Sequence, residues 1–287
     1  MIEYILGNYL VEKQKLTQAQ FQSAIYAQNN VRVKLGLIAV SEGLMTKEQA
    51  DEVNRMQAIM DKRFGDIAVE KGYLTDAQVG RLLALQGNAY LSFVQTLVDE
   101  GSLTLEDVQE ALELFQKENG FTNTDIEVMK SDDVDKMVPL FLPTDDETYT
   151  ELVGVAIRMM IRLVDSHVYI GKASFEENYA VETLASQAME GDMNIITSLA
   201  GMGEALLALA CPFAQEVFDT VDEDAIDAVG EFLNNTNGIF ASALSQKDVT
   251  LELMPPEYSL NRTTVEGNVL VVPCYIGSSK IELIVKA

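Results

Sequence analysis

Two stretches of the chain share one pattern and together predict a helical repeat. Residues 34–57 read KLGLIAVSEGLMTKEQADEVNRMQ, and residues 63–86 read RFGDIAVEKGYLTDAQVGRLLALQ. The second begins 29 residues after the first, and each has a glycine third and a glutamine last. The same spacing extends to both sides, because a threonine follows an apolar residue at Thr17, Thr46, Thr75 and Thr104. Four phased copies indicate internal repetition rather than coincidence.

Each of these threonines has the neighbours of a helix N-cap. A Gln or Asp stands three residues later, as a capping box requires: Gln20, Gln49, Gln78 and Asp107. Three copies also carry a glycine just before the threonine, where a preceding helix would end: Gly43, Gly72 and Gly101. We therefore predict two short helices per repeat and an all-α domain over residues 1–118.

Segments 34–57 and 63–86 resemble the tandem 24-residue motifs of the MshEN domain, which also occurs at the N-terminus of type II secretion ATPases. The resemblance extends over about residues 1–116 and implies that paired motifs can bind cyclic di-GMP. The ligand-binding residues that it implies are Lys34, Gly36, Gln57, Arg63, Gly65 and Gln86. An arginine beside a backbone opened by glycine can stack on a guanine and pair with a phosphate.

The repeats depart from this family pattern at the leading arginine, which only Arg63 supplies. The equivalent positions hold Ile5, Lys34 and Ser92, and Val94 replaces the glycine in the fourth copy. A second interpretation therefore stays open, in which the glycines allow tight helix packing and the glutamines act as caps. The repeats would then form a protein-docking scaffold.

The helical pattern stops after Gln116, and an acidic connection follows. Residues 130–135 read KSDDVD, and Pro139 and Pro143 come soon after. Acidic segments punctuated by proline are typical of connections between domains. We therefore predict a linker over residues 119–145, which leaves a second domain over residues 146–287.

The C-terminal half mixes helical and strand periodicity. Helices are predicted over residues 147–164, 204–215 and 223–244. Strands are predicted over residues 178–199, 248–254, 268–275 and 280–286. Strands interrupted by paired helices indicate an α+β domain rather than a parallel doubly wound sheet.

Within the predicted helix 223–244, four residues share one polar stripe: Asp227, Glu231, Asn234 and Gly238. At about 100° per residue they fall within roughly 60° of arc, whereas Ile226, Val229, Phe232, Leu233, Ile239 and Phe240 occupy the other side. An acid can bind a cation, and an amide one turn later can orient a water molecule for hydrolysis. The alternative interpretation is the solvated face of an amphipathic helix.

Residues 224–238, with a helix before them and a strand ending at Pro255-Pro256 after them, resemble the CheX branch of the CheC/CheX/FliY phosphatases. The resemblance covers about residues 147–287 and implies hydrolysis of the phospho-aspartate of a response regulator in chemotaxis or related two-component signalling. It implies that Glu231 contacts a lysine of the regulator and that Asn234 positions the attacking water, with Asp227 and Gly238 supporting them. The Mg²⁺ would be bound by the regulator, so no metal site is expected in this chain.

Two departures from the family pattern, and one further implication, follow from the same stretch. The proline pair stands one or two residues earlier than usual, which we interpret as a turn variation. Asn235 and Asn237 stand where apolar residues are common, which we interpret as a change in partner choice. CheX-like proteins pair through their sheet edges, so a homodimer is expected, with the strand at 268–275 as the candidate edge.

Composition excludes several classes of partner. The net charge of −25, without a Lys/Arg cluster, argues against binding to nucleic acid or to an anionic membrane surface. Cys211 and Cys274 are too few for a disulfide framework, and no run of 18 apolar residues or basic leader occurs. These features predict a cytoplasmic protein.

Two functions from different classes remain. The first is a response-regulator phosphatase that uses Glu231 and Asn234, with the N-terminal repeats regulating or docking it. The second is a non-catalytic signalling adaptor or cyclic di-GMP receptor. The phosphatase requires the polar stripe to be open to a partner, whereas the receptor requires Lys34 and Arg63 to converge on one pocket.

Overall fold

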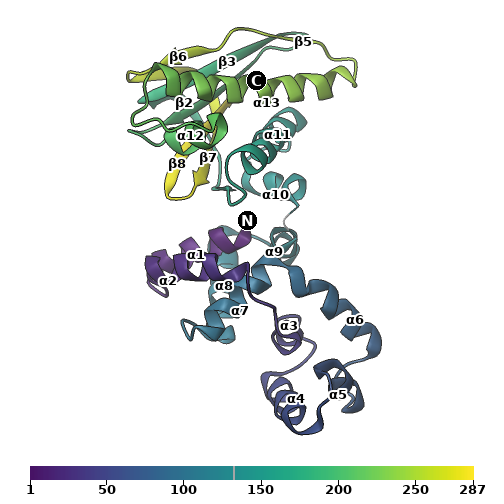
Figure 1. Ribbon diagram of the computed structural model, residues 1–287. Helices are drawn as coiled ribbons and strands as arrows, with labels where there is room; N and C mark the ends of the chain where they lie inside the picture. The colour runs from purple at the N-terminus through teal and green to yellow at the C-terminus, as the bar shows by residue number, and fades with distance from the viewer. Residues whose placement is uncertain (132) are drawn as a thin grey trace. The chain divides into compact units, whose positions relative to one another are not determined.

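The computed structural model describes residues 1–131 and 133–287, and the structural statements below concern these residues. The chain divides into two compact units, an N-terminal unit over residues 2–131 and a C-terminal unit over residues 133–287. Helices build the N-terminal unit, and the C-terminal unit combines an antiparallel sheet with helices (Figure 1). The predicted fold class, an all-helical region followed by an α+β region, is therefore confirmed.

The four repeats form four pairs of helices. The pairs are α1 (Ile2–Glu12) with α2 (Gln18–Gln28), α3 (Leu35–Ser41) with α4 (Lys47–Met60), α5 (Phe64–Glu70) with α6 (Asp76–Ala84), and α7 (Ala89–Asp99) with α8 (Leu105–Asn119). A short 3-10 helix, η1 (Leu85–Gly87), lies between α6 and α7. All four predicted capping boxes are present, because each threonine and its Gln or Asp partner exchange side-chain to backbone hydrogen bonds.

The turn inside each repeat requires a residue in the left-handed region. Gly43, Gly72 and Gly101 have φ values of 65°, 71° and 68°. The first repeat has Gln14 at the equivalent position, and its φ is 57°. A side chain is unfavourable in this region, so the first repeat keeps the turn of the others against a local conformational cost.

The segment expected to be a linker, residues 119–145, contains two helices. These are α9 (Asn123–Lys130) and α10 (Val134–Phe141). Thr122 and Asp133 cap their N-termini, and each helix buries a short apolar face. Of these two helices, α9 lies in the N-terminal unit and α10 in the C-terminal unit.

The C-terminal unit begins with α10 and the long helix α11 (Glu147–Leu163). Its strands are β1 (Tyr169–Ile170), β2 (Ser174–Val181), β3 (Thr183–Gly191), β4 (Ile195–Gly201), β5 (Leu251–Leu253), β6 (Glu257–Ser259), β7 (Thr263–Ile276) and β8 (Ser279–Lys286). They form one antiparallel sheet in the order β1-β7-β8-β4-β3-β5, with β2 also on β7 and β6 also on β3. The predicted stretch 178–199 thus contains parts of three strands, separated by Glu182 and by residues 192–194.

One expectation about this sheet is wrong. The strand at 268–275 was expected to be a free edge, but it lies within β7, which pairs with β8 on one side and with β1 and β2 on the other. Both rows of its backbone hydrogen-bonding groups are therefore used inside the chain, which leaves this strand no free edge for a second copy.

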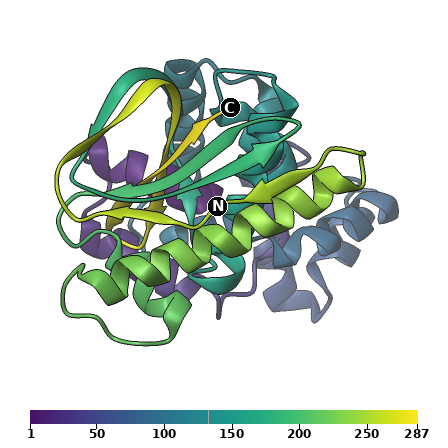
Figure 2. The same ribbon diagram turned by 90° about the horizontal axis from the view of Figure 1, so that it is seen from above.

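Helices α12 (Leu207–Ala214) and α13 (Glu223–Ser245) complete the unit. Helix α13 packs on β3, β4, β5 and β6, and α11 and α12 also contact it. Figure 2 shows α13 running along the sheet over its whole length. Phe232 and Phe240 are fully buried on its inner side, so the apolar face of α13 and the sheet share one core. The opposite face of α13 is left to the solvent.

Candidate functional site

The polar stripe lies on α13, whose N-terminus is capped by its own sequence. Asp222 is the N-cap, and its side chain accepts a hydrogen bond from the backbone N–H of Ala225. Glu223 and Asp224 follow in the first turn, where negative charge is favourable beside the helix dipole. The helix then continues for 23 residues, so the stripe stands on a rigid element.

The structure brings the predicted stripe residues together on one side of α13. Asp227 and Glu231 are exposed, while Asn234 and Gly238 are half-buried where the stripe meets the sheet. Ile239 was predicted to lie on the apolar side of the helix. That prediction is wrong, because Ile239 is 45% exposed. It lies at the border of the apolar arc, whereas its neighbour Phe240 is fully buried.

Glu231 is the open carboxylate of the stripe. Within the described part of the chain it makes no hydrogen bond or ion pair, so both of its oxygens are available to a partner. Asp227 differs, because its Oδ1 accepts a hydrogen bond of 2.9 Å from the hydroxyl of Tyr258. Of the two acids, only Glu231 therefore presents an uncommitted charge.

Tyr258, which the sequence analysis did not single out, crosses over the helix beside these acids. A Cβ atom on Gly230 would lie 2.4 Å from the Tyr258 hydroxyl, so the ring can rest there only because residue 230 is glycine. Partial burial, the hydrogen bond to Asp227 and the charges of Asp227 and Glu231 raise the pKa of Tyr258 to about 12. The phenol is therefore neutral at physiological pH and acts as a donor.

Asn234 is connected to a polar cluster beneath the helix. Its Oδ1 lies 2.9 Å from Nε2 of Gln187 on β3, and the same Nε2 lies 2.8 Å from the carbonyl oxygen of Met254. Oε1 of Gln187 accepts a hydrogen bond of 2.8 Å from Nδ2 of Asn237, which also contacts the Thr197 hydroxyl. Asn237 is fully buried, so it binds the helix to the sheet rather than facing a partner.

Sequence reasoning missed Gln187 and Thr197 because their role depends on contacts between distant segments. One signal was available for Gln187. Along β3 the buried positions alternate, at Thr183, Ala185, Gln187 and Met189, so a glutamine stands where an apolar side chain is usual. A buried amide requires partners, and these come from α13 and from the residue before Pro255.

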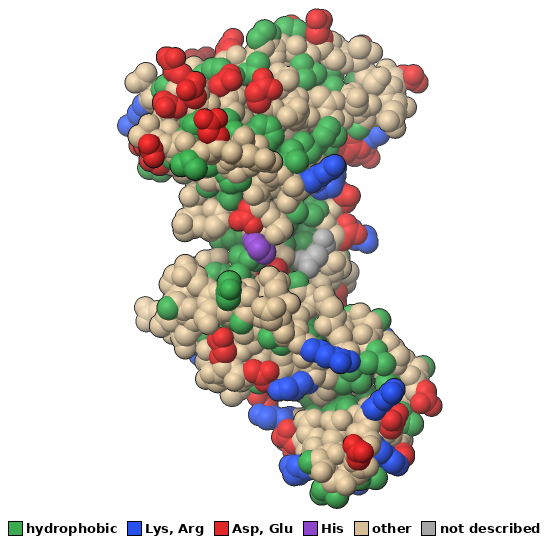
Figure 3. All heavy atoms as spheres, viewed as in Figure 1, with side chains coloured by type: hydrophobic (Ala, Val, Ile, Leu, Met, Phe, Trp, Pro, Cys, Tyr) green, Lys and Arg blue, Asp and Glu red, His purple; other side chains and the backbone are tan. Residues whose placement is uncertain are grey.

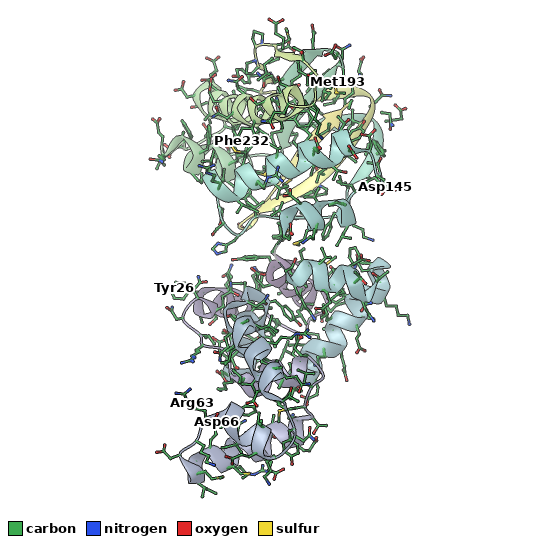
Figure 4. The ribbon with its side chains drawn as sticks, turned by 90° about the vertical axis from the view of Figure 1, so that its right-hand side faces the viewer. Tyr26, Arg63, Asp66, Asp145, Met193 and Phe232 are labelled. Atoms are coloured by element: carbon green, nitrogen blue, oxygen red, sulfur yellow. The ribbon has the colours of Figure 1, made fainter. Side chains whose placement is uncertain are left out.

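The N-terminal unit contains a second candidate site. A pocket of about 870 Å³ is lined by all six residues that the MshEN resemblance implies: Lys34, Gly36, Gln57, Arg63, Gly65 and Gln86. Lys34 forms an ion pair with Asp99, whose carboxylate lies 2.6 Å away. Arg63 forms none within the described residues, and Figure 4 shows it extending outward from the helices, close to Asp66. Arg32 and Asp66 also line the pocket.

The two terminal glutamines were expected to reach a ligand, but each is bound to backbone. The amide of Gln57 donates to the carbonyl of Lys62, the residue before Arg63, at 3.3 Å. The amide of Gln86 donates to the carbonyl of Val33, the residue before Lys34, at 2.7 Å. The last residue of each motif therefore binds the residue that precedes the other motif, so the two glutamine bonds are reciprocal.

Charge is distributed unequally along the chain. Residues 1–131 contain 12 bases and 19 acids, whereas residues 132–287 contain 8 bases and 26 acids. In Figure 3, Lys and Arg side chains gather over helices α3 to α6 and are sparse on the visible face of the sheet-containing unit. An anionic ligand would therefore find its favourable surface at the repeats.

No helix in residues 1–131 or 133–287 is both long and apolar enough to cross a membrane. The same residues contain no group of three or more His, Cys, Asp or Glu side chains arranged to bind a metal ion.

Comparisons with known proteins concern the C-terminal half. No protein family profile and no curated protein sequence matches the chain. Among solved structures, a CheC-like superfamily protein from Shewanella sp. PV-4 is 15% identical with a TM-score of 0.44, over 50% of this chain and 97% of that one. The chemotaxis protein CheX from Desulfovibrio desulfuricans is 17% identical with a TM-score of 0.44, over 49% and 99%.

A third similar chain is CheX from Borrelia burgdorferi, crystallised in a complex with CheY, BeF₃ and Mg²⁺. It is 16% identical with a TM-score of 0.40, over 48% of this chain and 96% of that one. The C-terminal half thus matches CheC- and CheX-like structures, whereas these comparisons leave the N-terminal helical unit unidentified.

Proposed function

We propose that the C-terminal unit is a phosphatase for the phospho-aspartate of a response regulator. The observation that carries this proposal is on α13, where the unpaired carboxylate of Glu231 stands one turn before the anchored amide of Asn234. Asp227 and Glu231 face the solvent, as docking to a partner requires. The pattern of residues 224–238 supports the same reading.

The chemistry assigns one task to each side chain. Glu231 binds a cationic group of the regulator, such as a lysine, and holds the two proteins in register. Asn234 holds a water molecule in line with the phosphorus–oxygen bond of the phospho-aspartate. As the water oxygen bonds to phosphorus, that bond breaks, which restores the carboxylate and releases inorganic phosphate. Mg²⁺ carried by the regulator would neutralise charge on the phosphoryl oxygens.

The test is the dephosphorylation rate of purified phosphorylated response regulators with the full-length protein. We expect the wild type to accelerate loss of the phosphoryl group and Glu231→Ala with Asn234→Ala to reduce that acceleration about 100-fold or more. Glu177→Ala with Asn268→Ala is a matched control, because it removes one exposed Glu and one exposed Asn from paired positions of β2 and β7. If the protein accelerates dephosphorylation of no regulator of the organism, the non-catalytic adaptor function is favoured instead.

The N-terminal unit supports a second proposal, that it is a receptor for cyclic di-GMP. The supporting observation is the pair of reciprocal glutamine bonds, which join two copies of one motif beside a single pocket. Two related half-sites suit a ligand made of two identical nucleotides. Arg63 supplies an unpaired guanidinium for stacking or for a phosphate. Gly36 and Gly65 line the same pocket, and each also leaves room for a packed side chain, Phe64 and Val79 respectively.

Calorimetric titration of the full chain with cyclic di-GMP tests this second proposal. We expect binding that Arg63→Ala weakens at least tenfold and that Arg55→Ala leaves unchanged, because Arg55 is exposed on α4 but does not line the pocket. Equal affinity of both variants, or no heat of binding in the wild type, would favour the protein-docking scaffold.

A further inference from the structure

The amide of Asn234 can face the solvent with either its nitrogen or its oxygen, and the two orientations have different chemistry. The nitrogen carries two donors and the oxygen only acceptors. The hydrogen-bond network beneath α13 decides between them, because one of its members has a fixed character.

That member is the carbonyl oxygen of Met254, which can only accept. Pro255 follows it, so the backbone at this point has no N–H to continue the ladder of β5, and Met254 is restricted to extended conformations. The Met254 carbonyl lies 2.8 Å from the end of the Gln187 side chain. That end must therefore be the amide nitrogen of Gln187.

The orientation of the Gln187 amide then determines the orientations of the Asn234 and Asn237 amides. With Nε2 of Gln187 facing Met254, its second hydrogen points to Asn234 across 2.9 Å, and the atom that receives it must be Oδ1. Oε1 of Gln187 faces the other way and accepts from Nδ2 of Asn237 at 2.8 Å. Gln187 is buried to 1% exposure, so water cannot substitute for these partners.

We propose that Gln187 is a positioning residue that holds Asn234 with its amide nitrogen outward, as a double donor to the phosphoryl-transfer site. The inference rests on the proposed phosphatase function for its catalytic consequence, but the orientation itself does not. Nδ2 of Asn234 has no partner within the described residues. Asn234 then acts by donating to the oxygen of the attacking water or to a phosphoryl oxygen, and takes no proton from either.

The network also explains two features that departed from the family pattern. Asn237 lies inside the helix–sheet core, where its Nδ2 donates a hydrogen bond to Oε1 of Gln187. This bond prevents the amide group of Gln187 from flipping. The proline pair near α13 ends β5 where the Met254 carbonyl is needed. Both departures therefore belong to one device for orienting a single side chain.

The orientation is tested in the wild-type protein by hydrogen exchange of side-chain amides, measured by NMR. We expect the two amide hydrogens of Gln187 to be protected from exchange with water and those of Asn234 to exchange freely. The reverse pattern, protected Asn234 and exchanging Gln187, would overturn the proposal whether or not the protein has phosphatase activity. Absence of activity with the expected exchange pattern would contradict only the proposed function.

The positioning role is tested with Gln187→Met, which keeps the volume and removes the hydrogen bonds. We expect kcat for dephosphorylation to fall about tenfold or more while KM for the phosphorylated regulator stays within about twofold, because Glu231 is untouched. Adding Asn234→Ala to Gln187→Met should lower kcat no further than Asn234→Ala does alone. Independent, multiplying effects of the two substitutions would overturn the role.

Thr197→Val is the control for a merely structural effect. It removes a buried hydroxyl from the same cluster, through Asn237, but leaves the contact between Gln187 and Asn234 in place. We expect both variants to lower thermal stability and only Gln187→Met to lower kcat. If Thr197→Val lowers kcat as much as Gln187→Met does, the effect is one of stability and the positioning role is rejected.

Discussion

In the N-terminal unit, each predicted helix cap joins residues three positions apart, such as Thr75 and Gln78. In the C-terminal unit, Asn234 is hydrogen-bonded to Gln187, 47 residues away in the sequence. Gln187 is in turn hydrogen-bonded to the carbonyl of Met254, 67 residues away. The first arrangement is local and repeated, so one copy can change without the others. The second is a single cluster, in which every member depends on the rest. We therefore expect the N-terminal unit to tolerate the loss of one helix cap. The C-terminal unit should instead be destabilised by the loss of any member of its cluster.

The largest expected effect tests the dependence within that cluster. Asn237→Leu leaves Oε1 of Gln187 and the Thr197 hydroxyl buried without their partner, so we expect the free energy of unfolding of the C-terminal unit to fall by about 3 kcal/mol. Native-state hydrogen exchange of the amides in β3 and β4 measures it, with α5 and α6 as the reference. Asn235→Leu, at the exposed neighbouring position, should change it by less than about 0.5 kcal/mol. Equal effects of the two variants would contradict the cluster's importance.

A smaller effect tests the independence of the caps. Thr75→Ala removes one capping box and should lower the stability of α6 by about 1 kcal/mol, without changing the exchange of α2 or α8. Thr124→Ala, at an exposed position inside α9, is the control and should change stability by less than about 0.5 kcal/mol. Loss of protection across all four repeats would show that the caps are not independent.

A substitution in the turn at Gln14 should stabilise the first repeat. Gln14→Gly relieves a side chain from the left-handed region and gives the first repeat the residue of the others, so we expect a gain of about 0.5–1 kcal/mol. Gln22→Gly, in the middle of α2, should have the opposite sign, since glycine weakens a helix interior. Chemical denaturation followed by circular dichroism measures both, and a loss at both positions would show that Gln14 is not strained.

The capping box of the fourth repeat should respond to pH, because its partner residue is a carboxylate, Asp107, where the other three have glutamine. Hydrogen bonds from the Thr104 hydroxyl and then from its backbone N–H hold the pKa of Asp107 below its usual value. Its contribution to stability is therefore present above the ordinary pKa near 3.8 and is lost as the pH falls through the lowered value. In Asp107→Asn, the exchange of α8 between pH 5 and pH 3 should lose this dependence. An unchanged pH profile in the variant would assign it to another carboxylate.

The sequence predicts most where interactions are local. The 29-residue spacing placed the helix starts of all four repeats correctly, and the residues of the stripe share a face because helical spacing alone determines it. The cap at Thr122 was missed because it stands 18 residues after Thr104, outside the repeat spacing, although Asp125 completes it. Ile239 was misplaced because it lies at the border of the apolar arc, next to the buried Phe240. Gln187 and Tyr258 could not be assigned, since their partners on α13 are known only once the strands are placed.

The two glutamine bonds of the repeats also bear on how this unit could change by duplication or deletion. Gln86 reaches back 53 residues, across both motifs, to Val33, while Gln57 reaches forward 5 residues to Lys62. Removing either of the two copies that begin at Lys34 and Arg63 keeps the phase of the other helix caps but takes away one of these two glutamines. The heritable module is therefore the pair of motifs, and we expect gene rearrangements that preserve this pocket to gain or lose repeats two at a time.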